Sequence, residues 1–413
     1  MKKYNMANLA AVFTVSFMAW CYCVATAVLG LVYQAYPGQD SKTVLIATLP
    51  TVVTIVAAFL ATPIFKAVTR KWAAIISLII AFICSMLILY ADLSLISVIA
   101  CSALLGIPAG LIPAANASLV TIVAPLSLRD KVIGWHNALM MLGMAAFTFL
   151  AGLFAKSGDF HLAYKAQFIL IPAIIIAILF YPNVDRDQKR AGLNTAGDAA
   201  SEPASEKNAG NIQKFPWYAA VFVALYLVGC IFWNAWYMNY SDYVINVARI
   251  GDASVAGLIG TFSSIGGTIA GFIVPWFIKG LKGWSMPVAF IVCGLTMLLP
   301  PITQSAVGCY IGGFVCQLFN LFIVSGLTTY AGLGTEGTKF STLTLSLITV
   351  GEGAGVFLCG YILPALGNLF GGGAGANLIV GSVAVMIIGV VSIFPMRPAH
   401  KIVYDDTENE TGR

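Results

Sequence analysis

The sequence predicts an all-α polytopic membrane protein with twelve transmembrane helices, arranged as two six-helix bundles related by pseudo-symmetry. Charged residues make up only 9% of the 413 residues and hydrophobic residues make up 59%, whereas a soluble domain carries roughly 25% charged residues. The apolar residues are also gathered into stretches of about 20, the length that a helix needs to cross a bilayer. These stretches lack the alternation of polarity that is typical of a transmembrane β-barrel.

Twelve apolar stretches follow one another along the chain. The first begins just after Met1-Lys2-Lys3 and continues to Tyr33, which is too long for the apolar core of a signal peptide, so we interpret it as a retained span. In order, the expected spans are 7–33, 44–65, 72–91, 94–123, 133–155, 166–182, 216–240, 254–278, 284–303, 306–332, 341–366 and 377–396.

A polar segment separates the sixth span from the seventh. Residues 183–214 are rich in Ala, Gly, Ser, Asp, Glu and Lys, the composition of a flexible linker. We therefore expect four parts: an N-terminal bundle over 1–182, a cytoplasmic linker over 183–214, a C-terminal bundle over 215–397 and a cytoplasmic tail over 398–413.

The distribution of Lys and Arg predicts the orientation. If the N-terminus is cytoplasmic, eighteen of these residues fall in cytoplasmic segments and four in external ones. Because cytoplasmic segments are enriched in Lys and Arg, we expect a multi-pass protein of the cytoplasmic (inner) membrane with both termini and the linker inside. The net charge of +5 then reflects topology, and no basic tract with interleaved aromatic residues suggests a nucleic-acid partner.

The two halves of the chain show an internal repeat. Shifting the sequence by 208 places Leu139–Gly152 over Leu347–Gly360 with six identities, and shifting it by 209 places Ala10–Phe13 over Ala219–Phe222 with four. Two six-span halves in the same orientation are typical of transporters whose substrate site lies near the bilayer midplane, between the halves.

The fourth span and the loop after it carry a family resemblance. The segments Gly106–Asn116 (GIPAGLIPAAN) and Pro125–Gly134 (PLSLRDKVIG) resemble the glycine-rich fourth helix and the arginine-bearing loop of the major facilitator superfamily. Between the second and third spans, Phe65 and Val68 stand where that family has an acidic residue and a glycine. The resemblance implies a secondary transporter that works by alternating access. It also implies a cytoplasmic gate, for which the basic candidates are Lys66, Arg70, Lys71 and Arg129.

One charged residue lies deep in a span. Glu352 is about twelve residues from the inner end of the eleventh span, or about 18 Å along a helix. A carboxylate there costs several kcal/mol unless it is paired or protonated, so we take it as a candidate for proton coupling. Alternatively, Glu352 caps neighbouring hydroxyls in a wet cleft, or Gly351, Gly353 and Gly355 only allow tight packing. His136 in the fifth span is a second candidate for proton coupling, and its alternative is a structural histidine at a helix end.

Candidate substrate-binding residues come from the four spans that line the central cavity of the family. A small-molecule site combines apolar walls with a few hydrogen-bonding groups, and each of the four spans offers such residues. Tyr240 and Tyr243 are instead assigned to the aromatic belt at the membrane surface. The substrate-binding candidates are Trp20 and Tyr22 in the first span, Asn116 in the fourth, Trp233, Asn234 and Tyr237 in the seventh, and Gln317 and Asn320 in the tenth.

Absent features narrow the function. No Lys or Arg lies deep in a span, which favours neutral, aromatic or weakly cationic substrates over dianions. No nucleotide, zinc or nucleophile motif is found, so we expect no enzyme activity, no metal and no cofactor. We predict a monomeric symporter that takes up a small organic solute with a proton, with sodium as the alternative ion.

Two other functions stay open at this point. The first is a proton antiporter that exports lipophilic or cationic drugs, although Phe147-Thr148 replaces the Gly-Pro pair of exporters in the fifth span. The second belongs to another class: a non-transporting membrane receptor on the same fold.

Overall fold

The computed structural model describes residues 6–123, 129–185, 215–335 and 340–405, and every regular element in these ranges is helical. Eleven helical segments in these ranges are long and apolar enough to cross a membrane. One of them, Ala253–Thr303, has 51 residues and would extend about 76 Å as a single helix, against a hydrocarbon core of about 30 Å. It contains two long helices joined by a short turn at Lys282–Trp284. The segments therefore provide twelve crossings, and the predicted fold class is confirmed.

The chain forms two compact units. The first unit comprises Met1–Glu202 and Gly251–Thr261, and the second comprises Pro203–Ile250 and Phe262–Arg413. The predicted linker lies outside the described residues except for 183–185, and the predicted tail is described only as far as 405. The predicted domain boundaries therefore stay a prediction.

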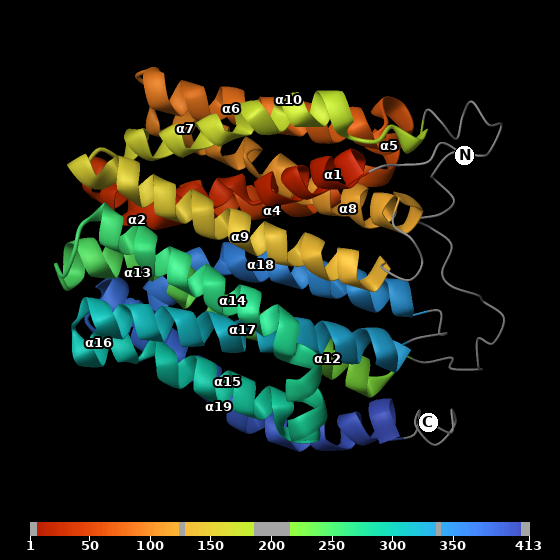
Figure 1. Cartoon of the computed structure of the whole chain (residues 1–413). Coiled ribbons are helices and arrows are strands. Elements are labelled where there is room, and N and C mark those ends of the chain that lie inside the picture. Colours follow the sequence, from red (N-terminus) through yellow and green to blue (C-terminus); the bar gives the residue numbers. More distant parts are fainter. Residues whose placement is uncertain (1–5, 124–128, 186–214, 336–339, 406–413) are drawn as a thin grey trace. The chain divides into compact units, whose positions relative to one another are not determined.

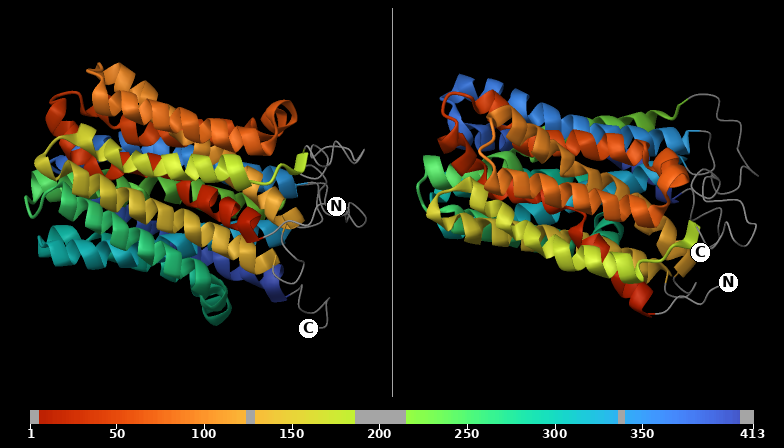
Figure 2. Two further views of the ribbon diagram at one scale, coloured as in Figure 1. Left: turned by 45° about the horizontal axis from the view of Figure 1, so that its top comes forward. Right: turned by 90° about the horizontal axis from the view of Figure 1, so that it is seen from above.

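The helices of the first unit run side by side (Figures 1 and 2). Three packing relations define this unit: α1 packs against α9 and α10, α4 packs against α7 and α8, and α6 packs against η4 and α8. The elements are α1 (Met6–Met18), η1 (Cys21–Cys23), α2 (Val24–Ala35), α3 (Asp40–Thr43), α4 (Leu45–Phe59), α5 (Ala61–Val68), α6 (Arg70–Tyr90), α7 (Leu95–Leu104), α8 (Gly106–Val123), α9 (Arg129–Phe154), η3 (Ala155–Ser157), η4 (Phe160–Ile169) and α10 (Leu170–Phe180).

The second unit is organised around α12, which packs against α17, α18 and α19, while α15 packs against α17 and α19. Its elements are α12 (Trp217–Trp233), α13 (Ala235–Asp242), η6 (Tyr243–Val247), α14 (Ala253–Leu281), η7 (Lys282–Trp284), α15 (Ser285–Met297), α16 (Leu299–Thr303), α17 (Ala306–Thr335), α18 (Ser341–Gly367), η8 (Asn368–Phe370), α19 (Gly373–His400) and η9 (Lys401–Asp405). The first turns of α14 belong to the first unit.

Several predicted single spans are interrupted helices. The first span bends around the short 3-10 segment η1, and the seventh changes from α12 to α13 at Asn234. Backbone groups at such a bend need partners because the bilayer core offers no water. At the first bend, the side-chain amide of Gln167 donates to the carbonyl oxygen of Cys21 at 2.8 Å. A buried polar side chain of the sixth span thus stabilises the interruption in the first.

Glycines allow the first and fifth helices of each unit to approach closely. A Cβ atom added at Gly143 of α9 would collide with the carbonyl oxygen of Phe17 in α1. In the second unit, Gly351 of α18 faces Leu227 of α12, and a Cβ atom added at Gly355 would lie 2.5 Å from the Cβ atom of Cys230. Small residues four apart allow this close packing of membrane helices. The close approach between the fifth and first helices is therefore at Gly143 in the first unit and at Gly355 in the second, whereas Gly351, which the repeat aligns with Gly143, makes an ordinary contact.

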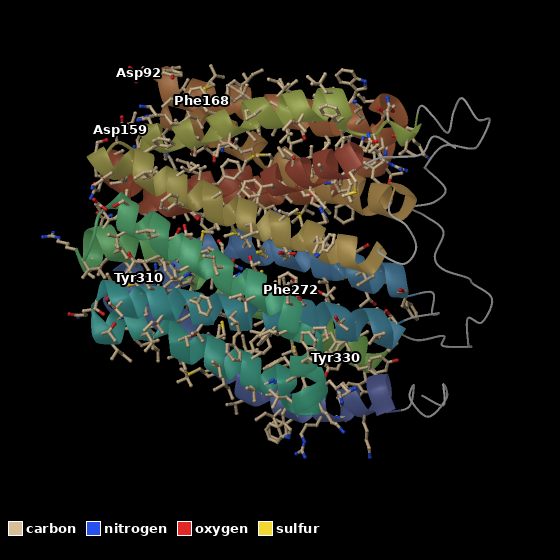
Figure 3. The ribbon with its side chains drawn as sticks, viewed as in Figure 1. Asp92, Asp159, Phe168, Phe272, Tyr310 and Tyr330 are labelled. Atoms are coloured by element: carbon tan, nitrogen blue, oxygen red, sulfur yellow. The ribbon has the colours of Figure 1, made fainter. Side chains whose placement is uncertain are left out.

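The surfaces of both units carry large apolar side chains. In the first unit, Ile83, Leu87, Ile175 and Leu179 on α6 and α10 are all exposed. Contiguous apolar surface of this kind is rare on soluble proteins and suits contact with lipid tails. Asp92 and Asp159 lie together at one end of this unit (Figure 3), beyond the ends of α6 and α9.

Candidate functional site

Glu352 lies within the second unit, eleven residues after the start of α18 and so about 16 Å along the helix. Its side chain keeps an exposed surface. The hydroxyl group of Tyr226, which is only 1% exposed, donates a hydrogen bond to the Glu352 carboxylate. The thiol of Cys230 donates to the backbone oxygen of Glu352 at 3.2 Å. The carboxylate is thus held against one face of α12.

The glycines that flank Glu352 explain this placement. Gly355 approaches Cys230 so closely that a side chain there would displace one of the two helices, and Gly351 faces Leu227 one turn away. Because α12 and α18 meet along these glycines, the intervening Glu352 is brought within reach of Tyr226. The hydrogen bond with the Tyr226 hydroxyl and the close packing at Gly355 are the features expected from the two structural alternatives for Glu352, and its role in proton coupling stays a prediction.

Trp233 and Asn234 lie just beyond Glu352, where α12 ends. The amide nitrogen of Asn234 donates to the carbonyl oxygen of Cys230 at 2.8 Å and lies 3.2 Å from its sulfur. Trp233 is 2% exposed, and its ring centroid lies 5.4 Å from that of Tyr226 and 6.2 Å from that of Phe290. These rings form an apolar wall beside the hydrogen-bond partner of Glu352.

The other candidates of the second unit lie on neighbouring elements. Tyr237 is half-buried on α13, one turn beyond Trp233. Gln317 and Asn320 are 6% and 5% exposed on α17, a helix that packs directly against α12. Among the described residues, the side-chain oxygen of Gln317 has no hydrogen-bond partner, and a buried unpaired oxygen of this kind costs free energy unless a ligand or water binds it.

In the first unit, Trp20 and Tyr22 are half-buried at the bend of the first span. Asn116 is fully buried in α8, and its amide nitrogen donates to Ser16 Oγ at 2.9 Å and to the carbonyl oxygen of Val12 at 3.4 Å. Its side-chain oxygen accepts a short hydrogen bond from the hydroxyl group of Tyr181. The polar atoms of Asn116 are therefore occupied by bonds within its own unit.

His136 joins the same cluster. Its ring is 3% exposed, and Nδ1 lies 2.6 Å from Ser16 Oγ. Tyr181 follows the end of α10, and its buried phenol hydroxyl donates to the side-chain oxygen of Asn116. The four side chains of Ser16, Asn116, His136 and Tyr181 form what we call the His136 cluster.

The basic candidates for the gate have different environments. Lys66 is exposed on α5, and the Lys71 ammonium donates to the carbonyl oxygen of Ile178 at 2.8 Å. Arg70 is buried beside Asp185: its Nε atom lies 3.6 Å from Asp185 Oδ1, with side chains 3% and 5% exposed. Arg129 is the first residue of α9, and its side chain lies outside the described residues, as does the 124–128 part of the loop that carries the family resemblance.

Asp185 also caps a helix. Its Oδ2 atom accepts from the backbone N–H of Arg70, the first residue of α6, at 2.7 Å. The residue before α6 is Thr69, whose φ of 72° is unusual for a non-glycine residue and whose side chain makes no cap. A carboxylate at a helix N-terminus satisfies an unpaired donor and interacts favourably with the helix dipole. Asp185 thus takes the place of a local cap.

Sequence reasoning missed Tyr226, Ser16, Tyr181 and Asp185 as members of these clusters. A weak signal exists for Asp185, because it is among the first acidic residues after the sixth span and the basic residues before the third span need a counter-charge. Ser16 and Tyr226 give no such signal, since single hydroxyl groups are common in membrane spans. Among the described residues, no group of three or more His, Cys, Asp and Glu could hold a metal ion.

Comparison with solved structures shows the same fold in known transporters. A POT family transporter solved in complex with a thioalcohol-conjugated peptide superposes with a TM-score of 0.69 at 11% identity, covering 95% of this chain and 96% of that one. Another, in complex with 5-aminolevulinic acid, gives 0.68 at 12% identity with the same coverage. At such identity the likeness concerns the fold alone.

Sequence comparison gives the family. A search of curated proteins found no match. The sequence profile described as Major Facilitator Superfamily matches residues 10–358, which is most of the chain and includes the larger part of each unit, together with Gly143, Gly351 and Glu352. The chain therefore belongs to the major facilitator superfamily of transporters.

Proposed function

We propose that the protein is a proton-coupled symporter for a small neutral or aromatic solute, with Glu352 as the group that binds the coupling proton. The observation that supports this most directly is the carboxylate of Glu352 in the middle third of a membrane helix, held by the Tyr226 hydroxyl. Protonation removes its charge. A charge at this depth is costly in lipid and tolerable in water. The ionised form of Glu352 therefore favours a conformation in which the site is open to water, and the protonated form tolerates one in which it is closed.

Coupling follows if inward-open and outward-open states bind the proton with different affinity, since a ligand shifts a conformational equilibrium only by its differential affinity. The ionised carboxylate accepts the hydrogen bond of Tyr226, whereas the protonated acid can donate its own. Glu352 can therefore exchange partners when the proton binds.

The proposed substrate site uses the wall beside Glu352. In the second unit it comprises Trp233, Asn234 and Tyr237 together with Gln317 and Asn320, whose buried amides offer donors and acceptors. In the first unit, taken by itself, the half-buried Trp20 and Tyr22 are proposed as substrate-binding residues, while Asn116 supports its own helix because its amide is already bonded. Lys66 and Arg129 are the gate candidates, and Arg70 and Lys71 support the first unit.

The test needs a ligand, and thermal stability can supply one. A bound ligand raises stability by RT ln(1 + [L]/Kd), so purified full-length protein is screened against neutral, aromatic and amine-bearing metabolites. The compound with the largest stabilisation is then used in proteoliposomes for two assays, namely counterflow and uptake driven by a pH gradient.

We expect Glu352→Gln to keep counterflow within a few-fold of wild type and to lose gradient-driven uptake by tenfold or more. Asp159→Asn, which changes an exposed carboxylate between η3 and η4, is the matched control and should behave like wild type in both assays. Wild-type pH dependence in Glu352→Gln would refute the coupling role.

A second candidate function, export of lipophilic or weakly cationic compounds, is favoured by the negative charge of Glu352, which could pair with a cationic substrate. This function predicts that the stabilising ligand is a cation, and that a pH gradient with the acidic side outside drives export of the ligand in exchange for protons. A receptor without transport would bind the ligand and give no counterflow.

A further inference from the structure

We propose that the His136 cluster is a second proton-binding site, located in the first unit, in which the Ser16 hydroxyl positions His136 and turns when the proton binds. The inference extends the proton coupling proposed above and uses residues that play no part in the Glu352 site. It rests on the hydrogen-bond geometry around Ser16.

Ser16 Oγ has three partners at hydrogen-bonding distance. His136 Nδ1 lies at 2.6 Å, the carbonyl oxygen of Val12 at 2.8 Å, and the amide nitrogen of Asn116 at 2.9 Å. A hydroxyl group has one proton to donate and two lone pairs to accept with. Asn116 must donate and the Val12 carbonyl must accept, so the direction of the bond to His136 decides where the Ser16 proton points.

Two arrangements satisfy these valences. In the first, Ser16 donates to an unprotonated Nδ1, and the Val12 carbonyl keeps only the longer bond from Asn116, at 3.4 Å. In the second, a protonated Nδ1 donates to Ser16, which turns its own proton to Val12. Doubly protonated His136 allows only the second arrangement. Proton binding at His136 is thereby accommodated by rotation of one hydroxyl, without an unpaired buried group.

The cluster continues beyond Ser16. Asn116 is held in the orientation that donates to Ser16 because the Tyr181 hydroxyl, a donor, binds its side-chain oxygen. Tyr181 lies four residues before Asp185, the partner of Arg70.

The elements packed against α9 differ in the ionisable groups that they carry. Helices α1 and α8 carry none, although α1 and α8 supply Ser16 and Asn116. His136 is about 10 Å from the start of α9. The ionisable residues on or packed against α9 are Arg129, Asp130 and Lys131 at its start, Cys21, Tyr22, Cys23 and Tyr33 on η1 and α2, and Lys156, His161, Tyr164 and Lys165 on η3 and η4.

The repeat shows that this arrangement is specific to the first unit. The offsets of 208 and 209 align His136 with Thr344 and Ser16 with Leu225, whereas Glu352 aligns with Met144 and Tyr226 with Phe17. Among the described residues, each unit therefore has a polar contact between side chains of its first and fifth spans whose residues the repeat does not reproduce in the other unit. The contacts are Ser16 with His136 in the first unit and Tyr226 with Glu352 in the second.

The test observes His136 directly and needs no substrate. The chain has three histidines, His136, His161 and His400, so imidazole nitrogen NMR of full-length protein in lipid nanodiscs gives few signals. His136→Gln assigns the signal of interest. We expect this signal to titrate while the protein stays folded. We expect Ser16→Ala to change its Nδ1 shift and to lower its titration midpoint by about one pH unit, the size expected from losing one hydrogen-bond acceptor.

Ser77→Ala is the matched control. Ser77 is a buried serine of the same unit, and its hydroxyl group donates to the carbonyl oxygen of Ala74 in its own helix at 2.7 Å. It should leave the His136 signal unchanged, and Ser16→Thr should restore the wild-type titration. An unchanged midpoint in Ser16→Ala, or a His136 that stays neutral until the protein unfolds, would overturn the inference. Either result would leave the Glu352 uptake assay unaffected, so the two proposals fail separately.

Discussion

Arg70 and Asp185 form a buried ion pair whose two members are 115 residues apart in the sequence. The carboxylate also accepts the first backbone N–H of α6 at 2.7 Å. Removing two charges from water is costly, and their attraction repays that cost only when both are present. The side chains are 3% and 5% exposed, so neither charge is hydrated if the other is lost. At the scale of single residues, this pair is where we expect the largest effect on stability.

We predict that Asp185→Asn lowers the free energy of unfolding by on the order of 3 kcal/mol. Asparagine can still accept the backbone bond of Arg70, so the loss measures the uncompensated guanidinium. Chemical unfolding of purified protein in detergent provides the measurement.

Asp159→Asn is the control for this prediction. Asp159 pairs with His161 at 2.8 Å, but their side chains are 50% and 35% exposed, and an exposed pair contributes less than about 1 kcal/mol. The double variant Arg70→Gln with Asp185→Asn should recover part of the loss. Equal effects of Asp185→Asn and Asp159→Asn would show that the Arg70 charge is hydrated after all.

At the scale of helices, the contact between α12 and α18 depends on glycines with unequal demands. A Cβ atom at Gly355 would lie 2.5 Å from Cys230 Cβ and 2.9 Å from its sulfur, whereas one at Gly351 would lie 3.6 Å from Leu227 Cβ. The first distance forces the helices apart, and the second is an ordinary contact. Because the same crossing holds Glu352 beside Tyr226, separation of the helices also affects the proposed proton site.

We predict that Gly355→Ala destabilises the protein by about 1 to 3 kcal/mol, the usual cost of overpacking. Gly351→Ala on the same helix should be neutral or stabilising by up to about 1 kcal/mol, because alanine favours the helix. Thermal unfolding of the two variants measures the difference. If both variants unfold with wild-type midpoints, α12 and α18 do not meet at Gly355 as closely as the structure shows.

The sequence predicted where the membrane spans lie, but not where they are interrupted. Apolar length and the polar segment after residue 182 predicted all twelve spans, because the bilayer imposes one length on every span. The bends at Cys21 and Asn234 were not predicted. They depend on partners such as Gln167, which lies 146 residues away from Cys21. The contacts of Glu352 and His136 were hidden for the same reason: spacing along one helix does not tell which hydroxyl of another helix will face it.

At the scale of the whole molecule, repetition and asymmetry have separate roles. Gly143 and Gly351 are aligned by the repeat, and each faces the first helix of its own unit, but an added Cβ atom would clash only at Gly143. The polar contacts differ, with His136 in one unit and Glu352 in the other. A parallel repeat requires the two units to have the same orientation in the membrane. The positive-inside rule then predicts that every segment that follows an even-numbered span lies in the cytoplasm.

The orientation can be tested with single cysteines at connections of opposite predicted sides. The nine native cysteines are free thiols, and eight of them are buried, so their background reactivity should be low in wild type. We expect a membrane-impermeant maleimide to label Gly158→Cys, in the turn between η3 and η4, on intact cells. Gly280→Cys, near the end of α14, should react only after the cells are permeabilised. Neither position has an atom within 4 Å of an added Cβ atom, so neither substitution causes a clash. Gly158→Cys strains the backbone locally because φ is +93°, but the position is exposed in a short turn. Labelling of both variants on intact cells, or the reverse pattern, would refute the predicted cytoplasmic termini, because the charge count fixes every connection together.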